Sequence, residues 1–128
     1  MNIRVTAVAP GVIKTPMWTE DREKIRFIGE GDEWVSAGYV AETMVGLVEG
    51  GRMEVGGGGE GVSTGDSREE VRRVDVTGGM IVEVAKGKRR VVEQFNDPGP
   101  SGEGNTVGNI GLAFEEVFEK LEGGGWGG

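Results

Sequence analysis

The pattern of apolar and polar positions predicts a strand at the start of the chain and a sharp turn after it. Residues 3–9, IRVTAVA, are almost all β-branched or small, which is typical of a strand. Both faces of this run are apolar, so we expect a strand covered on both sides, as in a parallel sheet. Pro10 and Gly11 end the strand, because proline lacks an N–H and glycine lets the backbone turn and be approached closely.

Helical spacing follows the turn. Thr15 and Pro16 form a helix-opening pair, so we predict a short helix over residues 16–26. A longer helix is predicted over residues 36–49, with Ser36 as N-cap and a glycine pair as its end. Its apolar residues recur at helical intervals and should pack on a sheet; they are Val40, Met44, Leu47 and Val48.

Residues 50–79 differ from the segments on either side. They are rich in glycine and poor in apolar residues, so we interpret them as a linker, disordered or inserted. Gly56, Gly58 and Gly61 match the pattern G-x-G-x-x-G. However, too few residues precede them for a strand and no helix follows directly, so a linker is favoured over a phosphate loop.

The last third of the chain predicts a hairpin and a helix. Residues 80–85 and 89–95 have strand-like composition and are separated by the turn-like KGK. A loop rich in proline and glycine follows. Apolar residues then recur at helical spacing over residues 107–121, and residues 123–128 are expected to form a loose tail.

Composition restricts the function. The net charge is −8, which disfavours nucleic acid and anionic membrane surfaces as partners. The chain has no cysteine or histidine, so thiolate and imidazole chemistry is excluded. Its acidic clusters are interpreted as solvated faces, so no metal site is expected. No apolar run reaches the ~18 residues of a membrane span, and we expect a soluble, cytoplasmic protein.

Three segments resemble one enzyme family. IRVTAVAPGVIKTPM resembles the sixth strand and the following Pro-Gly segment of short-chain dehydrogenases/reductases. SAGYVAETMVGLVEG resembles the next helix of that family. GGMIVEVAKGKRRVVEQFNDPGPSG, with the later GWG, is similar to the carboxyl end of fungal hydroxyprostaglandin-dehydrogenase-like members. The resemblance implies an α/β fold: the C-terminal part of a Rossmann-type parallel sheet with packing helices, interrupted here by the glycine-rich linker.

The resemblance also implies a cofactor site at the Pro-Gly turn. In the family this turn borders the nicotinamide half of NAD or NADP, and the main chain at the position of Ile13 bonds the carboxamide. The matching cofactor residues here are Pro10, Gly11, Val12, Ile13 and Thr15. From the local pattern alone, the turn ends a strand and Thr15 merely caps a helix.

Substrate contacts are implied one helical turn further along. Met17 and Trp18 match that part of the family, whose substrates are secondary alcohols or ketones. The family's catalytic Tyr-x-x-x-Lys motif is absent, because the single tyrosine, Tyr39, is followed four residues later by Thr43. We therefore assign no catalytic residue and expect a fragment of an NAD(P)-dependent oxidoreductase that is inactive alone.

This interpretation divides the chain into four parts. Residues 1–49 would be part of a Rossmann domain, 50–79 the linker or insertion, 80–122 the last strand with its hairpin and helix, and 123–128 the tail. An alternative of another class remains open: a small non-catalytic α+β module that forms a homo-oligomer or binds a partner protein.

Overall fold

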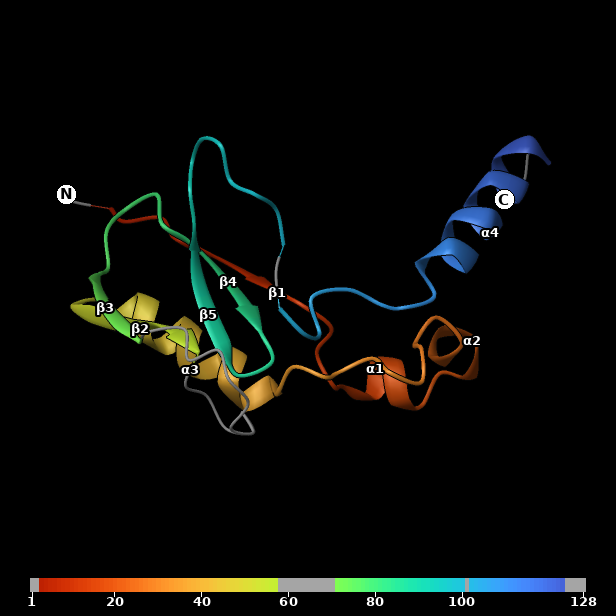
Figure 1. Ribbon diagram of the computed structural model, residues 1–128, viewed down its shortest axis with the longest axis horizontal. Coiled ribbons are helices and arrows are strands. Elements are labelled where there is room, and N and C mark those ends of the chain that lie inside the picture. The colour runs from red at the N-terminus through yellow and green to blue at the C-terminus, as the bar shows by residue number, and fades with distance from the viewer. Residues whose placement is uncertain (1–2, 58–70, 101, 124–128) are drawn as a thin grey trace.

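One mixed sheet with helices organises the fold (Figure 1). The computed structural model describes residues 3–57, 71–100 and 102–123. The strand order is β1-β4-β5-β2-β3. In chain order the elements are β1 (Ala7–Pro10), α1 (Pro16–Thr19), α2 (Arg22–Ile25), α3 (Ala37–Glu49), β2 (Arg52–Gly57), β3 (Arg72–Asp75), β4 (Ile81–Ala85), β5 (Lys88–Val92) and α4 (Ile110–Glu122).

The first strand is shorter and more exposed than its sequence predicts. β1 pairs in parallel with β4, opposite Ile81 to Val84, which confirms a parallel strand. Its pairing on that side begins before Ala7, since the N–H of Gly79 donates to the carbonyl of Val5 at 2.7 Å. The expectation that both faces are covered is wrong. β1 lies at the edge of the described sheet, and only Val8 packs against the core.

The helix predicted over residues 16–26 is two short helices instead. α1 ends at Thr19, and α2 starts after Asp21. The carboxylate of Asp21 accepts hydrogen bonds from the N–H groups of Glu23 and Lys24, at 2.9 and 3.3 Å. This side chain therefore caps a new helix where the prediction continued the old one.

The helix predicted over residues 36–49 is confirmed. α3 follows Ser36, ends before Gly50 at a φ of 77°, and contacts β1, β2 and β4. Its buried residues are Val40, Thr43 and Leu47. The apolar stripe that packs on the sheet is narrower than predicted, because Met44 and Val48 are exposed.

Part of the segment interpreted as a linker forms strands. β2 and β3 pair antiparallel, and β2 also pairs with β5 through Gly56 and Gly57. The linker interpretation is wrong for these residues, because Met53 and Val55 alternate with polar neighbours and are buried. Residues 58–70, which include Gly58 and Gly61, lie outside the described residues.

The predicted hairpin is confirmed. β4 and β5 are antiparallel neighbours, and the turn between them contains Gly87 at a φ of 62°. β4 is an interior strand: it pairs with β1 on one side and β5 on the other. The molecule is thus an α/β protein with a mixed sheet, whose core gathers where α3 crosses the sheet around Val35, Val82 and Val84.

The helix predicted over residues 107–121 is confirmed as α4, which projects away from the sheet (Figure 1). Residues 124–128, most of the expected tail, lie outside the described residues. Within the described ranges, none of the helices is long and apolar enough to cross a membrane.

A buried ion network fixes the loop after β5 onto the sheet. Glu83 on β4 is only 7% exposed, and its carboxylate accepts a hydrogen bond from Nε of Arg90 on β5 at 2.8 Å. The same guanidinium pairs with Asp97 and donates to the carbonyl of Gly99 at 3.0 Å. This hydrogen bonding from Arg90 lowers the pKa of Asp97 from 3.8 to about 2.

We expect this network to make stability depend on acid. The folded-state pKa of Asp97 lies below its ordinary value, so its contribution is complete above about pH 4 and is lost as the pH falls toward 2. In thermal denaturation, Asp97→Asn should lower the melting temperature at pH 5–7, and the difference from wild type should shrink as the pH falls through about 2. Asp75→Asn, at an exposed ion pair, should change little at any pH. A difference for Asp97→Asn that is constant with pH would contradict this account.

Candidate functional site

The Pro-Gly turn lies at the carboxyl end of β1, as its sequence predicts. Pro10 is the last residue of the strand, and the N–H of Gly11 continues the ladder by donating to the carbonyl of Val84 at 2.9 Å. β4 ends beside it. The turn therefore lies at the carboxyl ends of the two parallel strands, which is where α/β proteins bind ligands.

Beyond the turn, the main chain of Ile13 has an unused hydrogen-bonding pair. Ile13 forms a parallel bridge with Val35, but the hydrogen bonds belong to its neighbours: Val35 donates to Val12 at 2.8 Å, and Lys14 donates to Val35 at 3.1 Å. In such a bridge, the central residue's own N–H and C=O point the other way. Among the described residues, none forms a hydrogen bond to either group.

Thr15 carries a second unused group. It precedes α1 with extended backbone angles, as the N-cap prediction requires, but its side chain makes no capping hydrogen bond. Its Oγ1 is buried, and no described residue partners it. Leaving a buried hydroxyl without a partner costs about 1–3 kcal/mol. An amide or another polar group that reached Thr15 would therefore remove an existing penalty.

The two substrate-contact candidates lie in α1, directly after Thr15. Met17 is exposed and Trp18 half-buried. The helix begins at Pro16 and has no buried residue, so these side chains stand on the surface beside the turn. All seven predicted residues lie within positions 10–18, on the turn and on the first helix after it.

A loop that the sequence analysis did not connect to this site covers one side of it. The carbonyl of Gly104 accepts a hydrogen bond from the N–H of Val12 at 2.7 Å. A Cβ placed on Gly11 would lie 2.0 Å from the same oxygen. The face of Gly11 thus contacts backbone, whereas the main chain of Ile13 and the hydroxyl of Thr15 have no partner among the described residues. Nothing in the spacing of residues 102–105 could have predicted this contact.

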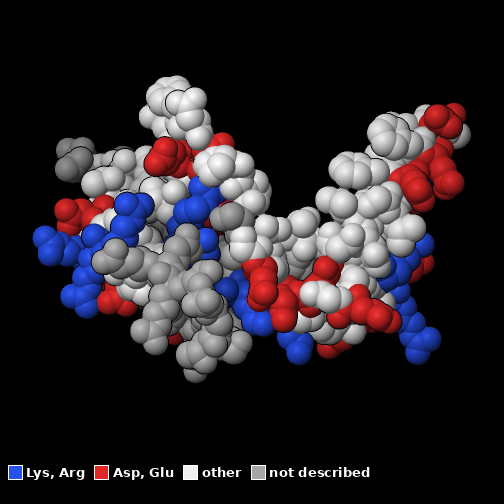
Figure 2. Space-filling view, viewed as in Figure 1, with Lys and Arg blue, Asp and Glu red and all other residues white. Residues whose placement is uncertain are grey.

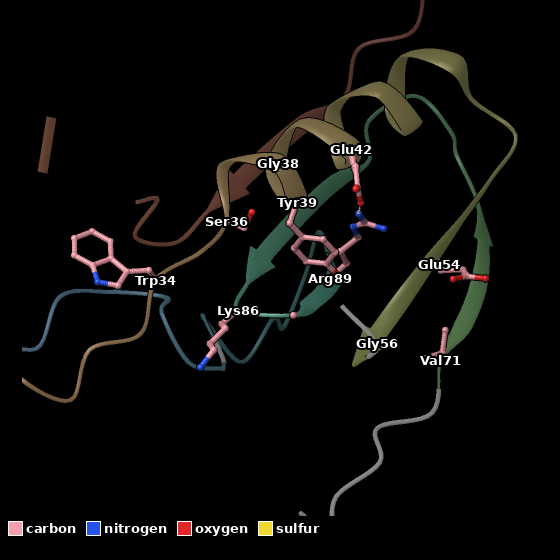
Figure 3. A pocket seen from close by; sticks show the side chains of 11 residues that line it. Trp34, Ser36, Gly38, Tyr39, Glu42, Glu54, Gly56, Val71, Lys86 and Arg89 are labelled. Carbon is pink, nitrogen blue, oxygen red and sulfur yellow. Dashed lines mark hydrogen bonds and ion pairs between the residues drawn. The ribbon is translucent and has the colours of Figure 1, made fainter. Parts of the chain in front are cut away.

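A cavity among the described residues lies elsewhere, at the start of α3 (Figure 3). Its volume is about 500 Å³, and it is lined by Trp34, Ser36, Gly38, Tyr39, Glu42, Glu54, Gly56, Val71, Lys86, Gly87 and Arg89. None of the residues predicted for the cofactor or the substrate lines it.

In this cavity, Arg89 stacks on the ring of Tyr39. The guanidinium of Arg89 lies over the ring of Tyr39, 4.2 Å from its centroid. It also donates to Oγ1 of Thr43 at 2.8 Å and to Glu42 at 3.3 Å. Burial raises the pKa of Tyr39, an effect that Arg89 partly opposes. This shift is opposite in direction to the lowered pKa that proton abstraction from an alcohol near neutral pH requires.

One carboxylate from each of two acidic clusters, residues 30–33 and 115–119, makes contacts within the fold. The carboxylate of Asp32 accepts the N–H of Gly29 at 2.8 Å and also that of Gly108, and these bonds lower its pKa. Glu116 pairs with Arg26 and Lys120. In the part of the chain that the structure describes, no group of three or more acidic side chains converges as a metal site would require.

Comparison with known proteins adds no assignment. No protein-family model matches the chain, and no curated protein or solved structure matches it either.

Proposed function

We propose that this chain is the carboxyl-terminal part of an NAD(P)-dependent short-chain dehydrogenase/reductase that acts on a secondary alcohol or ketone. One observation carries the proposal. A parallel strand ends in a Pro-Gly turn, and the N–H and C=O of Ile13 beyond it have no partner among the described residues. A donor and an acceptor on one residue are what a planar carboxamide requires.

Thr15 supports the same assignment. Its unpartnered Oγ1 follows Ile13 by two residues and matches the hydroxyl that contacts the cofactor amide or phosphate in the family that the segment resembles. When bound, the cofactor supplies or accepts the hydride. The chain's own residues would orient the nicotinamide from behind, and Met17 and Trp18 would contact the substrate.

No residue of this segment matches the tyrosine that transfers the proton in the family that the segment resembles. The resemblance implies a tyrosine whose pKa is lowered by a nearby lysine, whereas burial raises the pKa of Tyr39 and Arg89 stacks on it. We therefore expect the chain alone to oxidise no secondary alcohol with either NAD or NADP. An in-frame Tyr-x-x-x-Lys segment in the coding sequence upstream of Met1 would establish the parent enzyme.

The site itself is testable in the chain as it stands. Nicotinamide mononucleotide, added at millimolar concentration to ¹⁵N-labelled protein, should shift the amide resonances of Ile13 and Thr15. Thr15→Val keeps the shape of the side chain but removes the hydroxyl, and should weaken binding about tenfold, the usual value of one hydrogen bond to a buried polar group.

Thr77→Val is the matched control, because Thr77 is an exposed threonine in the turn before β4. That turn lies at the amino end of β4, whereas the Pro-Gly turn lies beside its carboxyl end. The control variant should bind like wild type. Shifts confined to other residues, or equal affinity of Thr15→Val and wild type, would refute the nicotinamide site.

A second function is favoured by a different observation. On the side of β4 away from β1, the sheet continues with three more strands, β5, β2 and β3. A sheet completed by strands of the chain itself is what a self-contained interaction module would have. Such a module should unfold in one cooperative thermal transition with no dye binding beforehand, whereas a stripped part of a larger enzyme should bind a hydrophobic dye and melt without cooperativity.

A further inference from the structure

An apolar seam with coiled-coil spacing runs along α4. Ile110, Phe114, Val117 and Leu121 are separated by four, three and four residues, which is the a/d pattern of two heptads. All four are exposed, between 41% and 57%. A seam of this kind is built to pack against another helix, and here it meets solvent.

The rest of the described chain leaves this helix without a packing partner. None of the described helices or strands packs against α4. It is attached at its start, where the N–H of Asn109 donates to the carbonyl of Phe27 at 3.1 Å, and by the Arg26–Glu116 ion pair. An isolated helix of 13 residues is marginal in water, so α4 gains stability from any helix that covers its seam.

The charged residues of α4 lie outside the a and d positions that form the seam. Figure 2 shows uncharged surface on the side of α4 that faces the hollow beside the sheet, and acidic atoms on the other side. In the heptad, the acidic residues occupy the outward b, c and f positions; they are Glu115, Glu116, Glu119 and Glu122. A second copy approaching the seam therefore meets no opposing carboxylates, although each chain carries a net charge of −8.

The positions flanking the seam fit a second copy in antiparallel orientation. Equivalent flanking positions then face each other across the pair. Phe118 would lie over Gly111 of the second copy, and Lys120 over Ala113, so each large side chain meets a small one. A Cβ at Gly111 would have nothing within 4 Å in the single chain, which leaves room for the ring.

We propose that the α4 seam is a homodimer interface in which two copies pair as an antiparallel two-helix coil. The exposed fractions of the seam and of Phe118 correspond to at most about 1,000 Å² of surface buried by the pair, which is in the range of weak, transient interfaces. The dimer is therefore weak and forms in the micromolar range. This proposal is independent of the nicotinamide site.

Analytical ultracentrifugation of the full chain from about 1 to 300 µM tests it. Wild type should pass from monomer to dimer over this range. Phe114→Glu puts a charge in the seam and should weaken the dimer at least a hundredfold. Because Phe114 is 55% exposed, the change empties no core, and circular dichroism would verify that the helix persists.

Leu112→Glu is the matched control. Leu112 is exposed to a similar extent, at 47%, but lies among the glutamates on the opposite side of α4, so its replacement should leave dimerisation intact. A monomer at every concentration, a Phe114→Glu variant that dimerises like wild type, or equal loss in both variants would each overturn the proposal.

Orientation is tested by crosslinking, since the chain has no cysteine of its own. A mixture of Ala113→Cys and Lys120→Cys chains, treated with a short bismaleimide, should yield mainly the mixed dimer, because these positions face each other only in the antiparallel pair. Crosslinks mainly between identical chains would overturn that orientation.

Discussion

Replacing Arg90 by methionine should lower the free energy of unfolding by about 2 kcal/mol. The guanidinium faces two carboxylates: Glu83, with a side chain 9% exposed, and Asp97, with a side chain 17% exposed. Removing one partner of a buried ion pair typically costs ~3–5 kcal/mol because a charge is left without compensation. We expect less here, because a fifth of the Arg90 side chain still reaches solvent.

Chemical denaturation at pH 7 would measure this loss as a lower midpoint in urea with an unchanged slope. Arg52→Met is the matched control, since the Arg52–Asp75 pair is more than 70% exposed on both sides and should change stability by no more than ~0.5 kcal/mol. Equal losses in the two variants would mean that the Glu83–Arg90–Asp97 network contributes no more than a surface ion pair.

The elements that the sequence predicted well are those whose signals are local. α3 has its cap, its stop and its apolar spacing within fifteen or so residues of each other, a span of four turns. The hairpin of β4 and β5 likewise needs only two apolar runs and Gly87 at a positive φ. In both cases the neighbouring residues alone decide the conformation.

The strands β2 and β3 were missed because their support is not local. Arg52 and Glu54 on β2 pair with Asp75 and Arg73 on β3, at 3.1 and 2.9 Å. These partners are separated by 23 and 19 residues in the sequence. A short stretch of sequence therefore shows its high glycine content but not the distant charged partners that support the strands. Met53 and Val55 alternate with these charges, and that alternation was the one local signal available.

The candidate site shows the same division. The turn at Pro10 and Gly11 and the extended Thr15 before α1 follow from the residues themselves. The partnerless main chain of Ile13 does not, because it depends on Val35 bonding to the residues on either side. The cover provided by Gly104 depends on a loop more than ninety positions away, as the numbering shows.

That cover makes Gly11 a position where a single methyl group should have a large effect. In Gly11→Ala, the new Cβ would lie 2.0 Å from the carbonyl oxygen of Gly104 and 2.8 Å from Cα of Asn105. Both are backbone atoms and cannot rotate away. Forcing atoms into a packed site costs about 1–3 kcal/mol or more, and we expect about 3 kcal/mol here.

A loss of this size should lower the melting temperature by ~10 °C in a domain of this length. Gly31→Ala is the control, because a Cβ at Gly31 meets nothing within 4 Å, and it should melt like wild type. Hydrogen exchange would locate the damage: the N–H of Val12, which donates to Gly104, should lose protection in Gly11→Ala. If Gly11→Ala melts like wild type and keeps that protection, the loop does not press on the turn. The face of Gly11 would then be open.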